Sequence, residues 1–269
     1  MNMVVAIKQV PDVPNIRIDR ERMTVIREGV ESIINPLDYV ALEAALDLRN
    51  RHGGKVVALT MGPLQSEEAL REALAAGADE GILLTDPAFA GADTLATSHV
   101  LARAISRTTP FPDLILCGMQ TIDSDTGHVG PQIAEELDVP QVCGVSEIHV
   151  DEECLVVKRV SDGSLDSVRV TMPVVLTVTQ HICEVRNLPL GALEAAFSEK
   201  SIVQWSMDQL GLEESEVGLS GSATQVWRLR PPPPRREGRV FDASPQELVD
   251  HLIRKLEGLS VLDEEEEDQ

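Results

Sequence analysis

The chain has 269 residues, of which 43% are apolar and only 3% aromatic, and its formal net charge is −22. This length and apolar content suffice for a globular domain with its own core. The negative charge argues against a nucleic-acid partner, because phosphate binding needs a basic surface and base stacking needs aromatic side chains. No apolar run approaches the ~20 residues of a membrane-spanning helix, so we expect no membrane insertion.

The N-terminus and the cysteines favour a cytoplasmic protein. The opening "MNMVVAIKQV" leads directly into a β-rich run, without the basic flank and cleavage site of an export signal. The cysteines form no C-x-x-C pair and do not cluster with histidines, which is typical of reduced packing thiols. They are Cys117, Cys143, Cys154 and Cys183. We therefore expect neither disulfides nor a metal site.

Short β-rich runs alternate with helical patterns in the first half of the chain. The β-rich runs are Met3–Val10, Val56–Thr60, Gly81–Thr85 and Leu114–Cys117. Helical patterns lie between them: apolar residues recur at helical spacing in Leu37–Arg51 and Asp93–Ser106. Ser66–Ala76 starts with an N-cap serine and first-turn carboxylates. This alternation predicts an α/β fold with a doubly wound, mainly parallel, Rossmann-like sheet. Ligands of such sheets bind beyond the carboxyl ends of the strands, where the strand order reverses.

The pattern changes after residue 154. "CLVVKRV" and "DSVRVTM" flank Asp162-Gly163, which predicts a hairpin within 154–179, and "VVLTVT" reads as a further strand. "NLPLGALEAAF" reads as an extended loop that enters a helix. We expect residues 1–225 to form one nucleotide-binding or flavin-binding domain.

The C-terminal part is expected to be a strap and a helix. Four consecutive prolines favour an extended segment within 226–262. Ser244 and Pro245 then begin an amphipathic helix that runs to Leu259. Its apolar face packs either on its own domain or on a partner chain, and the residues alone leave both open. The acidic end, 263–269, reads as a disordered tail.

The stretch "GMQTIDSDTGHVGPQ", residues 118–132, carries the strongest signal for a ligand. Pro131 is tolerated only in a first helical turn, so the following helix begins no earlier than about Gly127. A helix start offers free N–H groups and a positive dipole end to an anion, and Gly127 and Gly130 let the backbone approach a ligand closely. These features favour a nucleotide with its phosphate at 126–130.

Other interpretations of this loop remain open. Asp123 and Asp125 are suited to capping or to accepting a hydrogen bond from a ribose hydroxyl. As an Asp-x-Asp pair they lack a further acidic ligand for magnesium. Asp123 with His128 is a conceivable acid–base pair, and a tight turn with capping residues at Asp125 and Thr126 is the plainest alternative. The chain has neither a G-x-G-x-x-G fingerprint nor a Walker A sequence. A nucleotide-sensing or nucleotide-hydrolysing protein is a further alternative, and the lack of a phosphate-binding lysine in this loop counts against it.

Taken together, these stretches strongly resemble the beta subunit of electron transfer flavoproteins. The resemblance spans nearly the whole chain and includes "VAIKQVPD", "NPLDYVALEAAL", "MGPLQSEEALREALAAGADEGILL", "PQIAEELDVPQV" and "GLSGSATQVWRLRPP". It implies a doubly wound sheet like that of the adenine nucleotide alpha hydrolases. It also implies a C-terminal arm that wraps onto an alpha subunit.

The family divides by the nucleotide that the beta subunit holds. Simple carriers hold AMP as a structural ligand, whereas electron-bifurcating members hold a second FAD that exchanges hydride with NADH. "AGADTLATS" (Ala90–Ser98) and "DSDTGHVGP" resemble the bifurcating group. The resemblance therefore implies FAD in this chain, with AMP as the alternative, and NADH as the electron donor.

The resemblance also supplies candidate site residues. Those expected to bind the cofactor are Ala6, Asn35, Thr94, Thr97, Gln120, Asp123, Asp125, Thr126, Gly127, His128, Val129 and Gly130. Ser124, Gly127 and His128 depart from the usual glycine, alanine and glutamine, and a charge on His128 would change the flavin potential. No side chain is expected to perform covalent catalysis.

A second set concerns a partner. "CEVRNLPLGAL" (Cys183–Leu193) replaces the family's N-E-P-R-Y-x-S-L, with Arg186 and Leu190 retained. In the family this loop contacts a flavin-dependent dehydrogenase, of the acyl-CoA or hydroxy-acid type, and a leucine at the position of Leu190 is the apolar anchor. Its altered neighbours indicate a different dehydrogenase partner or a loop reshaped for other reasons.

Overall fold

The computed structural model describes residues 1–12, 17–19, 24–26, 32–152, 154–198, 201–227 and 240–259. Contacts divide the chain into two units, Met1–Arg228 and Leu229–Gln269, which are described separately below. Within the described ranges, no helix combines the length and the apolar character needed to cross a lipid bilayer.

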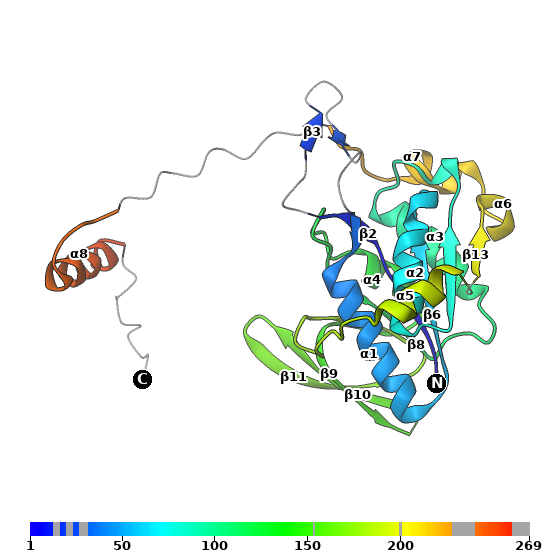
Figure 1. Ribbon diagram of the computed structural model, residues 1–269, viewed down its shortest axis with the longest axis horizontal. Coiled ribbons are helices and arrows are strands. Elements are labelled where there is room, and N and C mark those ends of the chain that lie inside the picture. Colours follow the sequence, from blue (N-terminus) through cyan, green and yellow to red (C-terminus); the bar gives the residue numbers. More distant parts are fainter. Residues whose placement is uncertain are drawn as a thin grey trace. The chain divides into compact units, whose positions relative to one another are not determined.

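One nine-stranded sheet forms the centre of the first unit (Figure 1). Its strand order is β11-β10-β9-β12-β8-β1-β6-β7-β13. The strands in chain order are β1 (Asn2–Ala6), β6 (Lys55–Met61), β7 (Glu80–Leu84), β8 (Leu114–Gly118), β9 (Gln141–Asp151), β10 (Cys154–Ser161), β11 (Ser164–Thr171), β12 (Val174–Val178) and β13 (Ile202–Trp205). Along this order, every neighbouring pair from β9 through β12 and β8 to β13 is parallel. The pairs β11–β10 and β10–β9 are antiparallel. The predicted mainly parallel α/β sheet is confirmed.

Helices cover both faces of this sheet. One face carries α1 (Pro36–His52), α2 (Glu67–Ala76) and α5 (Leu190–Ser198), and the other carries α3 (Thr94–Ser106) and α4 (Val129–Leu137) (Figure 1). Each face has its own apolar core, so β1, β8 and β12 are buried on both sides. This explains why their sequences are continuous apolar runs and do not alternate.

Shorter elements complete the first unit. They are the helices α6 (Met207–Leu210) and α7 (Gly218–Gly221) and the 3₁₀ turns η2 (Leu64–Ser66), η3 (Pro87–Phe89) and η4 (Glu214–Glu216). Asp162 and Gly163 connect β10 to β11 with φ values of 47° and 78°, which is the geometry of a tight two-residue hairpin turn. The hairpin predicted at this dipeptide is confirmed.

The strand order reverses between β1 and β8. From β1 the chain adds β6 and then β7 on one side, and α3 then carries it back to β8 on the other side of β1. The loops that follow β1 and β8 therefore flank the switch point, which is where ligands of doubly wound sheets bind. Residues 118–132 include one of these two loops.

The sequence prediction differs from the structure in three strands. The strand expected at 3–10 ends at Ala6, and β2 (Gln9–Pro11) pairs instead with β5 (Ser32–Ile34) outside the main sheet. The break occurs because the Lys8 amide donates to the Asp38 carboxylate and not to a neighbouring strand. Strands β9 and β13 were not predicted. A further small pair joins β3 (Arg17–Asp19) to β4 (Thr24–Ile26).

The described part of the second unit contains α8 (Pro245–Glu257). Ser244 and Glu247 form a reciprocal capping box at its start, as the sequence predicts. The Phe241 ring lies against His251, with ring centroids 4.2 Å apart. The acidic tail and the proline run predicted from the sequence lie outside the described residues.

Candidate nucleotide site

A lysine from the loop after β1 contacts the loop after β8. Lys8 Nζ lies 2.6 Å from Asp123 Oδ2, which joins residues 115 positions apart in the sequence. Burial acts to raise the pKa of Asp123, but the hydrogen bonds from Lys8, Thr121 and Ser124 outweigh it and hold the pKa below its usual value. Asp123 is therefore an ionised group whose two oxygens both have partners within the chain.

Asn35 fixes the loop after β8 from the start of α1. Its side chain is fully buried, its Nδ2 donates to the Gln120 carbonyl at 3.0 Å, and its Oδ1 accepts from the Ile122 amide at 3.1 Å. Asn35 and Gln120, both predicted cofactor residues, are thus hydrogen-bonded to each other. The amide group of Asn35 is engaged by the protein backbone, so its role in this arrangement is to shape the loop.

The loop also carries its own internal hydrogen bonds. The hydroxyls of Thr121 and Ser124 lie 2.9 Å apart, and Ser124 Oγ donates to Asp123 Oδ1 at 3.2 Å. The Asp125 amide donates to the Thr121 carbonyl at 2.9 Å, and Asp125 has a φ of 54°. Ser124, the departure from the usual glycine, therefore contributes a hydroxyl to the turn.

Helix α4 begins unusually close to the sheet. A Cβ added at Gly130 would lie 2.4 Å from Thr177 Cγ2 and 2.9 Å from Cys117 Sγ. Only glycine allows this approach, which places the first turn of α4 directly on β8 and β12. Gly127, just before the helix, has a φ of 66°. The helix begins at Val129, within the limit that Pro131 sets.

The first turn of α4 has polar groups without protein partners. His128 occupies the N-cap position, and no side chain of the described residues caps the helix there. Gln132 Oε1 is buried and has no hydrogen-bond partner among the described residues. Free N–H groups suit an anion, and a buried unpaired carbonyl suits a ligand hydroxyl or amino group. This donor and acceptor set fits a nucleotide.

The start of α3 is different. Asp93 caps it, with Oδ1 accepting from the Leu95 and Ala96 amides at 3.0 Å. Asp93 Oδ2 also accepts from the amide and the hydroxyl of Thr224, each at 2.8 Å. Burial acts to raise the pKa of Asp93, but these hydrogen bonds outweigh it and lower the pKa. The predicted residues Thr94 and Thr97 lie in this capped first turn.

The predicted cofactor residues thus fall into two groups. Those that converge on the switch point are Ala6 at the end of β1, Asn35 before α1, and Gln120, Asp123, Asp125, Thr126, Gly127, His128, Val129 and Gly130 after β8. Thr94 and Thr97 begin α3, which packs beside α4 on the same face of the sheet. Both helices follow strands and run back along the sheet, so both start at its carboxyl edge.

Sequence reasoning missed Lys8, Asp38 and Gln132. Lys8 and Asp38 act through hydrogen bonds to residues that are distant in the sequence, and no local sequence pattern marks them. Gln132 had a local signal, because it directly follows Pro131 and so occupies the first turn of a helix thought to bind an anion.

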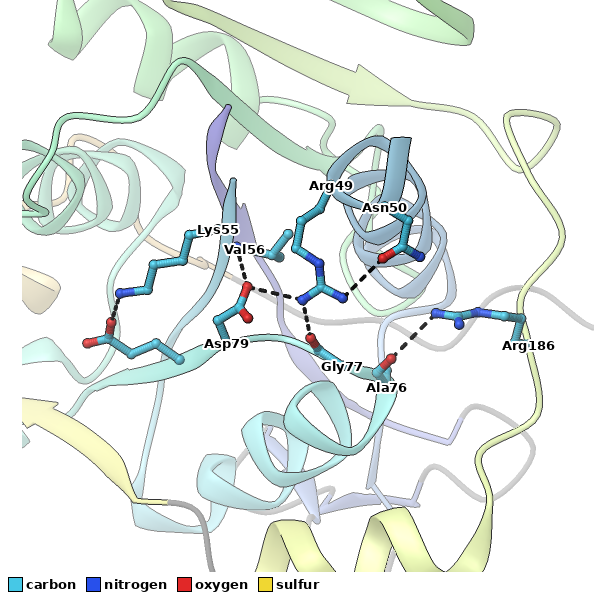
Figure 2. Close-up of polar contacts among 9 residues, drawn as sticks. Arg49, Asn50, Lys55, Val56, Ala76, Gly77, Asp79 and Arg186 are labelled. Carbon is cyan, nitrogen blue, oxygen red and sulfur yellow. Dashed lines mark hydrogen bonds and ion pairs between the residues drawn. The ribbon is translucent and has the colours of Figure 1, made fainter. Parts of the chain in front are cut away.

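The expected partner-binding segment is anchored to the body of the domain by Arg186. Arg186 Nε donates to the buried Glu43 Oε2 at 2.7 Å. Its Nη2 donates to the Ala76 carbonyl at 3.4 Å, as Figure 2 shows. Arg49 similarly donates to the Gly77 carbonyl at 2.6 Å (Figure 2). Two arginines therefore satisfy carbonyls at the end of α2, where a helix dipole favours positive charge.

Leu190 is exposed and lies at the start of a helix. It is the first residue of α5 and its relative exposure is 81%. The far end of α5 is held by Arg71, whose Nη1 donates to the Ala196 carbonyl at 2.8 Å. Of the two predicted partner residues, Leu190 is presented to solvent and Arg186 is bound to α1 and α2.

Comparisons with known proteins identify the family. The model of the electron transfer flavoprotein domain matches residues 22–209. The electron transfer flavoprotein subunit beta of Thermoanaerobacterium thermosaccharolyticum is 44% identical over 262 residues, which cover 97% of this chain and 100% of that protein. The chain belongs to the electron transfer flavoprotein beta subunits.

Two further relatives carry different names. This beta subunit is 42% identical to Protein FixA of Sinorhizobium fredii, over 95% of this chain and 93% of that protein. It is 41% identical to subunit CarD of the caffeyl-CoA reductase-Etf complex of Acetobacterium woodii, over 95% of this chain and 98% of that protein. The beta subunit fold and family predicted from the sequence are confirmed over nearly the whole chain.

Proposed function

We propose that this beta subunit binds FAD between the loops after β1 and β8 and passes electrons by flavin-based bifurcation. In this proposal it pairs with an alpha subunit, receives electrons from NADH and serves a partner dehydrogenase. The observation that carries the nucleotide site is the first turn of α4, where, among the described residues, no side chain caps the helix and the buried Gln132 Oε1 has no hydrogen-bond partner.

The chain's own residues would hold and orient the cofactor. The N–H groups that begin α4 suit its phosphate, and Gln132 Oε1 accepts from a hydroxyl or amino group. Asn35 and Lys8 hold the loop that carries these groups. When bound, FAD supplies the hydride and single-electron chemistry, and the protein supplies binding and electrostatics.

The choice of bifurcation rests on the resemblance of two stretches, Ala90–Ser98 and 123–131, to bifurcating members. One observation favours the simpler carrier that holds AMP. Asp93 closes the start of α3, so of the two neighbouring helix starts only that of α4 is open, and one open start suits one phosphate. The hydrolase alternative receives no support from the family.

We further propose two docking segments. Residues 183–193 would contact a flavin-dependent dehydrogenase, of the acyl-CoA or hydroxy-acid type, through the exposed Leu190. The 226–262 segment, with α8, would dock on the alpha subunit, since the apolar residues Leu248, Val249 and Leu252 of α8 are exposed.

Counting nucleotides tests the proposal. The chain is co-expressed with its alpha subunit, the purified heterodimer is denatured, and released FAD and AMP are quantified. Two FAD and no AMP per heterodimer are expected. One FAD and one AMP would refute bifurcation and leave a simple carrier, and no nucleotide beyond the alpha FAD would refute the site.

Two glycine substitutions test where the nucleotide binds. Gly130→Ala should empty the beta site while the alpha FAD remains, because its Cβ would push the first turn of α4 away from Thr177. Gly81→Ala is the matched control, since the nearest atoms to its Cβ lie 3.5 Å away, an ordinary contact distance. Equal nucleotide content in the two variants would contradict a site at α4.

A further inference from the structure

A single buried carboxylate joins the two loops at the switch point. Asp38, in the first turn of α1, is 4% exposed. Its Oδ2 accepts from the Lys8 amide and its Oδ1 from the Gly118 amide, both at 2.9 Å. Lys8 follows β1 and Gly118 ends β8, so Asp38 spans the point at which the strand order reverses.

The fold makes room for this carboxylate at Gly118. A Cβ added there would lie 2.6 Å from Asp38 Oδ1 and 2.7 Å from Leu37 Cβ. Any side chain at this position would therefore separate α1 from the end of β8. The lack of a side chain at Gly118 lets α1 lie close enough for the Asp38 carboxylate to accept from the Gly118 amide.

We propose that Asp38 is a positioning residue of the nucleotide site, whose ionised carboxylate holds the loops after β1 and β8 at the separation that binds the nucleotide. This inference rests on the proposed function. Within the described residues, the Asn35 side chain bonds the loop after β8 and its backbone amide donates to the Lys8 carbonyl at 2.8 Å, whereas Lys8 Nζ bonds Asp123. Asp38 bonds the backbone of both loops.

Protonation of Asp38 would weaken this link. Each carboxylate oxygen accepts one amide N–H, so a proton on either oxygen competes with one of the two loops. Burial raises the pKa of Asp38 to about 7, against the hydrogen bonds from Asn35, Gly118 and Lys8 that act to lower it. The two loops are thus held by a group that titrates near neutral pH.

Two other titratable groups lie next to Asp38 in the described part of the chain. The Lys8 ammonium is paired with Asp123, whose pKa is lowered. The Cys117 thiol of β8 stays protonated, because burial and the neighbouring carboxylate raise its pKa. A change near pH 7 that is present in the wild type and absent in Asp38→Asn would therefore report Asp38, as distinct from His128 at the N-cap of α4.

The size of the effect follows from the ionised fraction. For a group that titrates near pH 7, this fraction changes about tenfold between pH 6 and pH 8. An apparent dissociation constant varies inversely with the fraction of molecules competent to bind, so it should change by about tenfold as well.

The experiment uses the heterodimer with its alpha subunit, depleted of the beta nucleotide and titrated calorimetrically with FAD, and separately with AMP, between pH 5.5 and 8.5. The wild type should bind about tenfold more weakly at pH 6 than at pH 8. Asp38→Asn should bind weakly throughout with a flat profile. FAD is the cleaner probe, because its pyrophosphate does not titrate in this range.

Asp47→Asn is the matched control, on the same helix but exposed and paired with Arg51. It should reproduce the wild-type affinity and pH profile. A flat wild-type profile, or an Asp38→Asn heterodimer that binds like the wild type, would overturn the inference. If Asp38→Asn does not fold, His128→Gln is titrated instead: a pH profile that persists without the imidazole supports Asp38, and a profile that becomes flat would overturn the inference. Failure of FAD and AMP to bind at any pH would instead refute the proposed function.

Discussion

Helices α3 and α4 lie side by side and begin at the same edge of the sheet, yet their starts are built in opposite ways. Asp93 closes the start of α3 by accepting from two amides of its first turn, and Thr224 completes the carboxylate. The start of α4 has no side-chain cap among the described residues, and Gln132 Oε1 is buried there without a partner.

The difference separates groups that serve stability from groups that serve a ligand. A satisfied cap lowers the free energy of the folded chain by itself, whereas a buried unpaired carbonyl costs free energy until something donates to it. We therefore expect substitutions at these two helix starts to change stability in opposite directions. Asp38 combines both features, because it is hydrogen-bonded and yet carries a buried charge.

Asp38 should show the largest effect on stability, and the effect should depend on pH. Its pKa rises from 3.8 to about 7 on folding, so between these values the folded state binds the proton more tightly than the unfolded state. The free energy of unfolding therefore falls as pH rises through this window, by up to about 4 kcal/mol at roughly 1.4 kcal/mol per pKa unit.

Urea unfolding of the wild type and Asp38→Asn at pH 5 and pH 8 measures this. The wild type should lose stability relative to the variant as the pH rises, although its nucleotide binding improves. Parallel pH dependences would show that the carboxylate is not penalised by burial.

Asp93→Ala should cost about 1 kcal/mol of unfolding free energy, because two amides of α3 lose their acceptor. Nucleotide affinity should change by less than about threefold. Since the pKa of Asp93 is lowered by folding, its contribution is present at neutral pH and disappears in acid. Asp93→Asn, which keeps an acceptor oxygen, is the control. Loss of nucleotide without loss of stability would break the contrast between α3 and α4.

Gln132→Met should change the stability of the nucleotide-free chain in the opposite direction to Asp93→Ala. Removing a buried carbonyl that lacks a donor should stabilise the nucleotide-free chain by up to about 1 kcal/mol. The same change should weaken nucleotide binding by about tenfold, because the ligand loses its partner. Chemical denaturation without nucleotide, followed by calorimetric titration, measures both. A variant that is less stable and binds normally would contradict the assignment.

Leu190→Ser should have the smallest effect on stability, within about 0.5 kcal/mol, because the side chain is exposed. Arg186→Ala is the matched change in the same segment and should cost more, because it leaves the buried Glu43 carboxylate without its arginine. Thermal unfolding compares the two variants. Equal stabilities would mean that Arg186 does not anchor the segment.

The local elements were accessible from the sequence because their signals are local. Apolar spacing located α1 and α3, the Ser-Glu-Glu start located α2, Pro131 limited the start of α4, and Asp162-Gly163 marked the hairpin. Strand β9 is only partly buried and mixes polar with apolar side chains, and β13 has only four residues, so neither stood out.

The site was accessible only in part. The sequence located the loop after β8, but the residues that hold it depend on which strands are neighbours. Asp38 reaches Lys8 and Gly118 across 30 and 80 positions, and periodicity does not reveal such distances. The role of Arg186 depends in the same way on Glu43, which is 143 positions away.

The position of β12 has a consequence for the order in which the molecule assembles. This strand lies between β8 and β9 and pairs with both, so it joins the doubly wound part of the sheet to the antiparallel β9–β11 part. The Met119 amide, at the start of the loop after β8, donates to the Val178 carbonyl of β12 at 3.0 Å. Such pairings between distant parallel strands form slowly. The two parts can build their local contacts early, but the loop proposed to bind the nucleotide is complete only after residue 178 has been synthesised and inserted.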